Sequence, residues 1–274
     1  MEVKGVLSVV IPAYNEERRL GAALERVGSW LRSCGRSAEV IVVDDGSTDG
    51  TARIALGVQL PCRITVLRNP ANQGKGAALR RGVLASSGEL VLATDADLPV
   101  PLEWVSVLER YLSAGADVAV GSRRAPGAVI TRQQPFARRV AGRAFNMLVR
   151  SLLGVKLLDT QCGFKLFRGE AARRLFGQCV SDGFAIDAEV LARALLNGYR
   201  VVEVAVSWAH SGGSSVRLLH HSLEMAHELL KIRLVLREEG RLSGRSRSAA
   251  LQPKAGGSGG TDLLAAADGA HLEK

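Results

Sequence analysis

The chain contains few aromatic residues, few cysteines and no long apolar run. Phe, Trp and Tyr make up 4% of its 274 residues, and no basic stretch alternates with aromatic residues, so we expect no surface that stacks nucleic-acid bases. Cys34, Cys62, Cys162 and Cys179 lack the spacing of metal ligands or of a redox pair, which is typical of reduced cytoplasmic thiols. No apolar run approaches the roughly 20 residues that span a bilayer, and no signal peptide is recognisable at the N-terminus.

What the chain does contain is apolar residues and positive charge. Its 47% of hydrophobic residues are enough to build a sizeable core. Its net charge of +9 indicates anionic partners. Because base stacking is not expected, a lipid surface or a phosphorylated substrate fits this charge better than nucleic acid does. We therefore expect a cytoplasmic protein, soluble or peripheral at the cytoplasmic face of the membrane.

Short apolar stretches alternate with helical patterns along the first two hundred residues. The predicted strands are Leu7–Ile11, Val40–Val43, Ile64–Leu67, Leu90–Ala93, Val118–Val120 and Val201–Val206. This alternation is typical of an α/β protein, with a single, mostly parallel, twisted sheet that carries helices on both faces. Three regions follow: a catalytic domain at 1–212, an amphipathic helix at 213–240, and a Ser-, Gly- and Ala-rich tail at 241–274 that is expected to be disordered.

Two carboxylates, Asp95 and Asp97, follow the predicted strand at Leu90–Ala93. They stand at or just beyond the carboxyl end of that strand, and this is the edge at which ligands bind in open α/β sheets. Two aspartates with one residue between them can direct oxygens at one point, and Mg²⁺ or Mn²⁺ prefers oxygen ligands. The pair therefore predicts a metal site, although taken alone it fits a solvated loop equally well.

Polar residues also follow the other early strands, in the loops Pro12–Glu16, Asp44–Ser47 and Gly74–Gly76. Parallel strands end at one edge of the sheet, so we expect these loops to meet the two aspartates there. At that edge a carboxylate could accept hydrogen bonds from a base or ribose, and Lys75, at a helix start, could contact a phosphate. The lysine loop lacks P-loop spacing, and no Gly-x-Gly-x-x-Gly follows the first strand, which argues against a dinucleotide-dependent dehydrogenase.

The motifs in these loops resemble those of glycosyltransferase family 2. The matching stretches are Val9–Glu17, Val42–Gly50, Asn72–Gly76 and Asp95–Asp97, in this order. Further on, Asp159–Phe167 resembles the members that glycosylate polyprenyl phosphates, such as the dolichyl-phosphate β-glucosyltransferases. The resemblance covers about residues 6–235. It implies a nucleotide-diphospho-sugar transferase (GT-A type) fold and an inverting, metal-dependent hexosyl transfer.

The family pattern also implies roles for individual residues. Those that would bind the nucleotide-sugar are Pro12, Ala13, Tyr14, Glu16, Asp44, Lys75 and Asp95. Among them, Asp44 would accept a hydrogen bond from the base, and Lys75 would stabilise the departing diphosphate. Asp97 would be the main ligand of Mg²⁺ or Mn²⁺, with Asp95 beside it. Arg123 and Arg138 would bind the phosphate of the acceptor.

The expected reaction moves a hexose, glucose being favoured, from a nucleotide-sugar such as UDP-glucose to a polyprenyl phosphate. A phosphate monoester is already anionic near neutral pH, because its second pKa is about 6, so it needs positioning by arginine and no base. Asp159 is the candidate base if the acceptor is a hydroxyl group. Alternatives are a GDP-mannose donor or a soluble or polysaccharide acceptor. A non-catalytic nucleotide-binding module fits poorly, since the metal carboxylates are present.

The predicted helix after Gly213 offers a way to reach a lipid acceptor from the membrane surface. Apolar residues recur in it at helical spacing, at Val216, Leu219, Leu223, Ala226, Leu230 and Leu234. Basic residues flank this stripe, at Arg217, Lys231, Arg233 and Arg237, and suit anionic headgroups. One alternative is that the stripe packs on the catalytic domain. Packing and docking can also coexist, with Leu229, Ile232 and Leu236 on a second face, or a membrane protein could recruit the chain.

Overall fold

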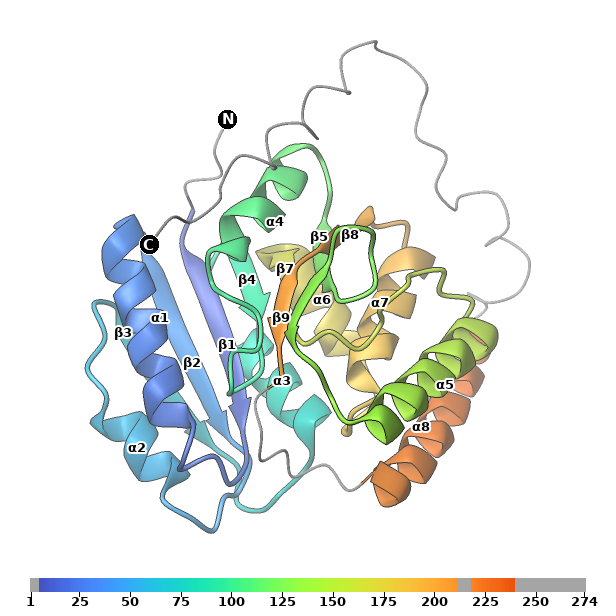
Figure 1. Cartoon of the computed structure of the whole chain (residues 1–274), viewed down its shortest axis with the longest axis horizontal. Coiled ribbons are helices and arrows are strands. Elements are labelled where there is room, and N and C mark those ends of the chain that lie inside the picture. Colours follow the sequence, from blue (N-terminus) through green and yellow to red (C-terminus); the bar gives the residue numbers. More distant parts are fainter. Residues whose placement is uncertain (1–4, 211–217, 240–274) are drawn as a thin grey trace.

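The computed structural model describes residues 5–210 and 218–239, and its centre is a seven-stranded sheet (Figure 1). The strands lie in the order β3-β2-β1-β4-β7-β5-β8. Their bounds are β1 (Leu7–Ala13), β2 (Ala38–Asp44), β3 (Arg63–Arg68), β4 (Leu90–Ala93), β5 (Val118–Ser122), β7 (Lys165–Arg168) and β8 (Val201–Ala205). Every strand predicted from an apolar run is present in this sheet.

Strand β7 runs antiparallel to both of its neighbours, β4 and β5. The β1–β2, β1–β4, β2–β3 and β5–β8 pairs are all parallel, which confirms the predicted mostly parallel sheet. Because β7 is reversed, its first residue, Lys165, lies opposite Ala93 and Val120 near the carboxyl ends of β4 and β5. The loop that precedes β7 is thereby delivered to the edge where the other polar loops end.

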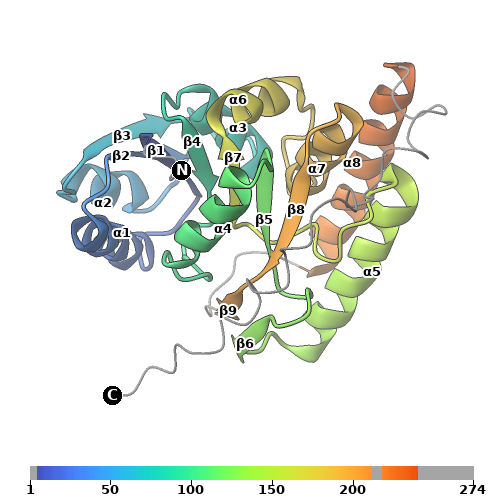
Figure 2. The same ribbon diagram turned by 90° about the horizontal axis from the view of Figure 1, so that it is seen from above.

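Helices cover both faces of the sheet, as predicted (Figure 2). One face carries α1 (Leu20–Cys34), α2 (Thr51–Gly57) and α4 (Trp104–Ser113). The other carries α3 (Lys75–Leu84), α5 (Phe136–Leu153), α6 (Gly169–Gln178), α7 (Ile186–Leu196) and α8 (Leu218–Glu238). Alternate residues of β1 face opposite sides of the sheet. Val9 and Ile11 lie in the core on the side of α1, α2 and α4, whereas Val10 lies in the core on the side of α3.

Close approach of α3 to the sheet depends on Gly82. A Cβ at this position would lie 2.5 Å from Cγ1 of Val10 and 2.9 Å from Cγ2 of Val43, so a larger side chain would push the helix away. This contact matters for the site because α3 begins at Lys75. The residues that set the depth of the helix on the sheet therefore also set the position of that lysine.

A second, two-stranded parallel sheet pairs β6 (Val129–Arg132) with β9 (Ser207–Ala209). It was not predicted from the sequence, because both strands are short and β6 is largely exposed. It lies beyond the carboxyl end of β5, and Val129 N donates a hydrogen bond to the carbonyl oxygen of Val206 at 3.2 Å. Ile130 of this small sheet and Trp208 of β9 line a cavity together with residues of α5.

Helix α8 (Leu218–Glu238) lies within the segment 213–240 and packs beside α5 (Figure 1). Leu229, Ile232 and Leu236 are fully buried in the core, whereas Leu230 and Leu234 are exposed. Residues 211–217 and 240–274, which include Val216 and the predicted tail, lie outside the described part of the chain. Among the described residues, no helix is both long and apolar enough to cross a membrane.

Candidate active site

The carboxyl ends of the parallel strands surround a cavity of about 480 Å³, here called the edge cavity. The residues predicted to bind the nucleotide-sugar and metal that line it are Pro12, Ala13, Tyr14, Glu16, Lys75, Asp95 and Asp97. Asp44 does not line it, because its side chain is fully buried, accepts a hydrogen bond from Ser47 N at 3.0 Å and pairs with Arg68 at 3.1 Å. Its neighbour Asp45 lines the cavity instead.

Two loops of the edge cavity contain backbone conformations that side chains rarely adopt. Among the described residues, the non-glycine positions with positive φ are Asn15, at 54°, and Leu98, at 45°. Asn15 follows β1 and is tied to the loop after β2, because Ser47 Oγ accepts its amide hydrogen at 2.9 Å. Leu98 directly follows Asp97. Such conformations persist only where surrounding contacts enforce them, and they gather at functional sites.

Asp95 and Asp97 both reach the edge cavity and remain partly open, with side chains 33% and 22% exposed. Arg19, which the sequence reasoning missed, lies 3.7 Å from an oxygen of Asp97 and also pairs with Glu16. Burial raises the pKa of Glu16 above its usual value, although its hydrogen bond to Arg19 opposes the shift. Arg19 thus lies between two carboxylates, those of Glu16 and Asp97.

The carboxylates of Asp95 and Asp97 in the edge cavity fit a divalent cation whose other ligands come from a substrate and water. Mg²⁺ in proteins is commonly held by one or two carboxylates together with phosphate oxygens and water, and Asp95 and Asp97 supply such a pair. Within residues 5–210 and 218–239, no group of three or more His, Cys, Asp or Glu side chains could hold a metal ion alone. A metal here would therefore bind most tightly together with a diphosphate.

Lys75 lies at the start of α3, where its ammonium group contacts two carboxylates. Its Nζ is 2.8 Å from Oδ1 of Asp95 and 2.9 Å from Oδ2 of Asp187. Burial alone would lower the pKa of Lys75, but the charges of Asp187 and Asp95 outweigh it and raise the pKa. Lys75 is therefore a permanent cation at the edge cavity, as the leaving-group role requires.

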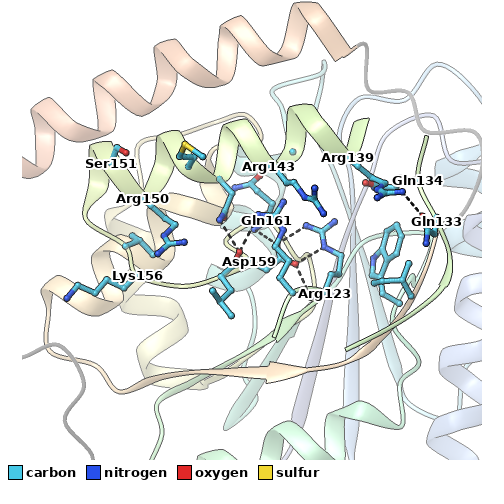
Figure 3. A pocket seen from close by; sticks show the side chains of 18 of the residues that line it. Arg123, Gln133, Gln134, Arg139, Arg143, Arg150, Ser151, Lys156, Asp159 and Gln161 are labelled. Atoms are coloured by element: carbon cyan, nitrogen blue, oxygen red, sulfur yellow. Dashed lines mark hydrogen bonds and ion pairs between the residues drawn. The ribbon is translucent and has the colours of Figure 1, made fainter. Parts of the chain in front are cut away.

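A second cavity of about 1070 Å³, here called the arginine cavity, lies between α5 and the small sheet (Figure 3). Six cationic side chains and a single carboxylate line it: Arg123, Arg124, Arg139, Arg143, Arg150 and Lys156, with Asp159. Of these cations, only Arg123 was assigned a role from the sequence. The side chains of Arg143, Arg150 and Lys156 form no hydrogen bond or ion pair with another described residue.

The single carboxylate of the arginine cavity is already neutralised. Arg123 grips Asp159 through two parallel contacts, Nε to Oδ2 at 2.7 Å and NH2 to Oδ1 at 2.8 Å (Figure 3). Asp159 is 1% exposed. Burial would raise its pKa, but the charge and hydrogen bonds of Arg123 prevail and lower the pKa of Asp159 to about 2.

Among the described residues, no other arginine of the arginine cavity forms an ion pair with a carboxylate. Burial, together with the charges of Arg123 and Arg143, lowers the pKa of Arg124 in spite of Asp159. Like charges gathered in this way repel one another, so the arrangement favours an anionic ligand. The side chain of Arg138, predicted to bind the acceptor phosphate, lies outside the described part of the structure.

The two cavities meet. Arg123, Gln134, Gln161 and Trp208 line both of them, and the guanidinium of Arg123 lies over the ring of Trp208, 5.5 Å from its centroid. A ligand in the edge cavity and an anion in the arginine cavity would therefore approach each other beside Arg123. The geometry suits transfer of a group between two phosphate-bearing substrates.

Comparisons with known proteins agree with this geometry. Residues 8–176 match the model of Glycosyl transferase family 2. The chain is 38% identical over 245 residues to the dolichyl-phosphate beta-glucosyltransferase of Mus musculus, covering 83% of this chain and 75% of that protein. It is similar to a crystal structure of glucosyl-3-phosphoglycerate synthase from Mycobacterium tuberculosis in complex with Mn²⁺, UDP and phosphoglyceric acid, with a TM-score of 0.63 and 25% identity over 86% of this chain and 78% of that one. Another crystal structure of that synthase, with Mg²⁺ and UDP, has a TM-score of 0.62 and 23% identity over 86% and 79% of the two chains.

The fold is of the GT-A type. The edge cavity lies at the carboxyl ends of its parallel strands. The chain belongs to glycosyltransferase family 2.

Proposed function

We propose that this protein transfers glucose from UDP-glucose to a polyprenyl phosphate, with inversion at the sugar and with Mg²⁺ or Mn²⁺ as cofactor. Relatives that share a third or more of its residues are named dolichyl-phosphate beta-glucosyltransferases. The related synthase structures contain UDP with Mn²⁺ or Mg²⁺. The donor is assigned to the edge cavity and the acceptor phosphate to the arginine cavity.

The observation that supports a phosphate acceptor is the charge of the arginine cavity where it joins the edge cavity. A neutral hydroxyl acceptor has no need of six cations, and it needs a general base. The one carboxylate in that cavity, Asp159, has both oxygens engaged by Arg123 and a pKa near 2. We therefore assign Asp159 to positioning Arg123, and the predicted base role is not part of this proposal.

The chain's own residues then divide the chemistry as follows. Arg143 and Arg124 attract the acceptor phosphate, and Arg123, held by Asp159, directs it toward the edge cavity. Lys75 stabilises the negative charge that grows on the departing diphosphate. A divalent cation on Asp95 and Asp97 would neutralise further charge on that leaving group.

The direct test is a panel of sugar nucleotides incubated with a polyprenyl phosphate, followed by product mass and sugar analysis. We expect transfer from UDP-glucose that EDTA abolishes and Mg²⁺ or Mn²⁺ restores. Transfer from GDP-mannose alone would overturn the proposed donor. Efficient transfer to a soluble or polysaccharide hydroxyl acceptor, with none to polyprenyl phosphate, would overturn the proposed acceptor. Nucleotide binding without any transfer or hydrolysis would show a binding module.

We further propose that the protein docks peripherally on the cytoplasmic face of a membrane through α5 together with α8. On α5, the exposed apolar residues Phe136, Val140 and Met147 are spaced by four and seven residues, so they share one helix face. Arg139, Arg143 and Arg150 repeat the same spacing beside them. The predicted α8 stripe contributes Leu230 and Leu234, which are exposed next to α5.

Apolar residues bordered by arginine suit the interface of an anionic bilayer. Met147 lines the arginine cavity, so a protein docked in this way would hold that cavity against the lipid in which the acceptor lies. The alternative is that a membrane protein recruits this protein to the membrane.

Flotation with anionic vesicles at low salt tests this docking. Phe136→Ser combined with Met147→Ser should reduce the floated fraction severalfold, while Leu56→Ser, an equally exposed apolar residue on α2, should leave it unchanged. Wild-type protein that stays with the soluble fraction would exclude direct docking and favour a recruiting partner.

A further inference from the structure

A cluster of buried charged side chains, Lys75, Asp187 and Lys165, lies beneath the edge cavity. Asp187 stands in the first turn of α7 and Lys165 begins β7. Asp187 accepts Nζ of Lys75 at 2.9 Å on one oxygen and Nζ of Lys165 on the other. The side chains of Lys165 and Asp187 are 1% and 7% exposed. Neither residue lines the edge cavity. Lys165 falls within the Asp159–Phe167 motif but was given no role from the sequence, and Asp187 lies outside every motif.

We infer that Asp187, itself held by Lys165, is a positioning residue that aims Lys75 at the diphosphate of the donor. Lys75 is the member of this cluster that reaches the edge cavity, where it also contacts Asp95. This inference rests on the proposed function, because it requires a nucleoside diphosphate as the donor's leaving group.

The carboxylate of Asp187 is held in one orientation by two lysines, Lys75 and Lys165. Lys165 is fixed by a second hydrogen bond, from its Nζ to the carbonyl oxygen of Cys162 at 2.5 Å. Asp187 is therefore shared by two cations, one of which is anchored to the backbone before β7. Burial would raise the pKa of Asp187, but the charges of Lys165 and Lys75 lower it to about 2, so the carboxylate stays charged and its hold on Lys75 is permanent.

The backbone around Lys75 is held by the same region of the chain. The amides of Gly76 and Ala77 donate to the carbonyl oxygen of Asp182 at 2.7 and 3.1 Å. A Cβ on Gly76 would lie 2.5 Å from the carbonyl oxygen of Ser181. The segment before α7 thus fixes the start of α3 while Asp187 fixes the lysine side chain, so both the position and the direction of the ammonium group depend on one neighbour.

Comparison of UDP with UMP isolates this role, because UMP lacks the second phosphate. By calorimetry in magnesium-containing buffer, we expect Asp187→Asn and Lys75→Met each to weaken UDP binding about tenfold and UMP binding less than about twofold, as loss of one charge-assisted hydrogen bond predicts. The double variant should bind UDP no more weakly than Lys75→Met alone, because Asp187 acts through that lysine.

A matched control exists on the same helix. Glu189 is a fully buried carboxylate two residues further along α7 that pairs with Arg193. Glu189→Gln should lower the melting temperature and leave the ratio of UDP to UMP affinity unchanged. If Asp187→Asn does not fold, Asp187→Glu keeps the charge but shifts the carboxylate by one methylene, and it should weaken UDP severalfold while sparing UMP.

The outcomes separate the two proposals. Wild-type protein that binds neither UDP nor UDP-glucose would overturn the proposed donor and this inference together. Wild-type binding of UDP, combined with an unchanged ratio in the Asp187 variants or with equal losses for UDP and UMP, would overturn the positioning role alone. Additive losses in the double variant would show that Asp187 does not act through Lys75.

Discussion

Replacement of Asp159 by Asn tests how the arginine cavity is organised. The wild-type carboxylate accepts three hydrogen bonds from Arg123, through the backbone amide at 3.0 Å, Nε at 2.7 Å and NH2 at 2.8 Å. Asn preserves the shape of the side chain but removes its charge and one acceptor oxygen. Arg123, whose side chain is 21% exposed, would then lie beside Arg124 and Arg143 without its ion-pair partner.

The magnitude follows from the geometry. A folded-state pKa of about 2 for Asp159, against roughly 3.9 in an unfolded chain, means that its charged form contributes about 3 kcal/mol to stability near neutral pH. Removing one partner of a buried pair commonly costs about 3–5 kcal/mol, because the other charge is left alone. We expect Asp159→Asn to lower the free energy of unfolding by about 3 kcal/mol at pH 7.

The sign of the pH dependence is fixed by the lowered pKa. The stabilisation by Asp159 is complete above the unfolded pKa, near 4, and is lost as the pH falls toward the folded pKa near 2. The difference between wild type and Asp159→Asn should therefore narrow by about 1 kcal/mol between pH 7 and pH 3.

Urea unfolding followed by circular dichroism at pH 7, 5 and 3 measures both quantities. Asp182→Asn is the matched control, because Asp182 also pairs with an arginine, Arg80, at 2.6 Å, but its side chain is 58% exposed. Such a surface pair contributes about 0–1 kcal/mol. If Asp159→Asn costs no more than Asp182→Asn, or if the difference stays constant from pH 7 to pH 3, then the buried pair does not organise the cavity as argued.

Three further changes test other parts of the site. Asp97→Asn should leave the melting temperature unchanged and lower kcat/KM about a hundredfold or more, because a metal ligand is lost; near wild-type turnover in Mg²⁺ or Mn²⁺ would exclude Asp97 as a ligand. Gly163→Ala places a Cβ 2.1 Å from Oδ2 of Asp95, so turnover should fall about tenfold or more as that carboxylate is displaced, and unchanged steady-state kinetics would refute the close approach. Arg143→Ala should raise the KM for polyprenyl phosphate about tenfold without changing the Kd for UDP by calorimetry; a loss of UDP affinity would assign Arg143 to the donor.

Local sequence patterns were sufficient to predict the sheet and most of the edge cavity. Each parallel strand spans four to seven residues and contains a short apolar run, and the polar residues that follow it must lie at the common carboxyl edge, because all these strands point the same way. Lys75, Asp95 and Asp97 were found for this reason. The signal is contained in a few consecutive residues, so it can be read without knowledge of the tertiary structure.

The residues whose roles were wrongly assigned or not found from the sequence are placed by contacts between distant parts of the chain. Asp44 and Asp45 are adjacent and both buried, and only the exact course of the backbone after β2 decides that Asp45 lines the edge cavity while Asp44 pairs with Arg68. Lys75 and Asp187 are 112 residues apart, and they meet because α3 and α7 pack on the same face of the sheet. The antiparallel insertion of β7 brings Lys165 to the same point.

The arginines of α5 show the same division. Helical periodicity predicts which residues share a face of that helix, but it does not say whether the face meets solvent, a core or a cavity. That depends on where the small β6–β9 sheet and the Asp159 loop lie against it. The sequence alone therefore determined the fold and most of the edge cavity, where residues next to each other in the chain act together. The tertiary structure decided the arginine cavity and the hold on Lys75, because charges become neighbours there only after the chain has folded.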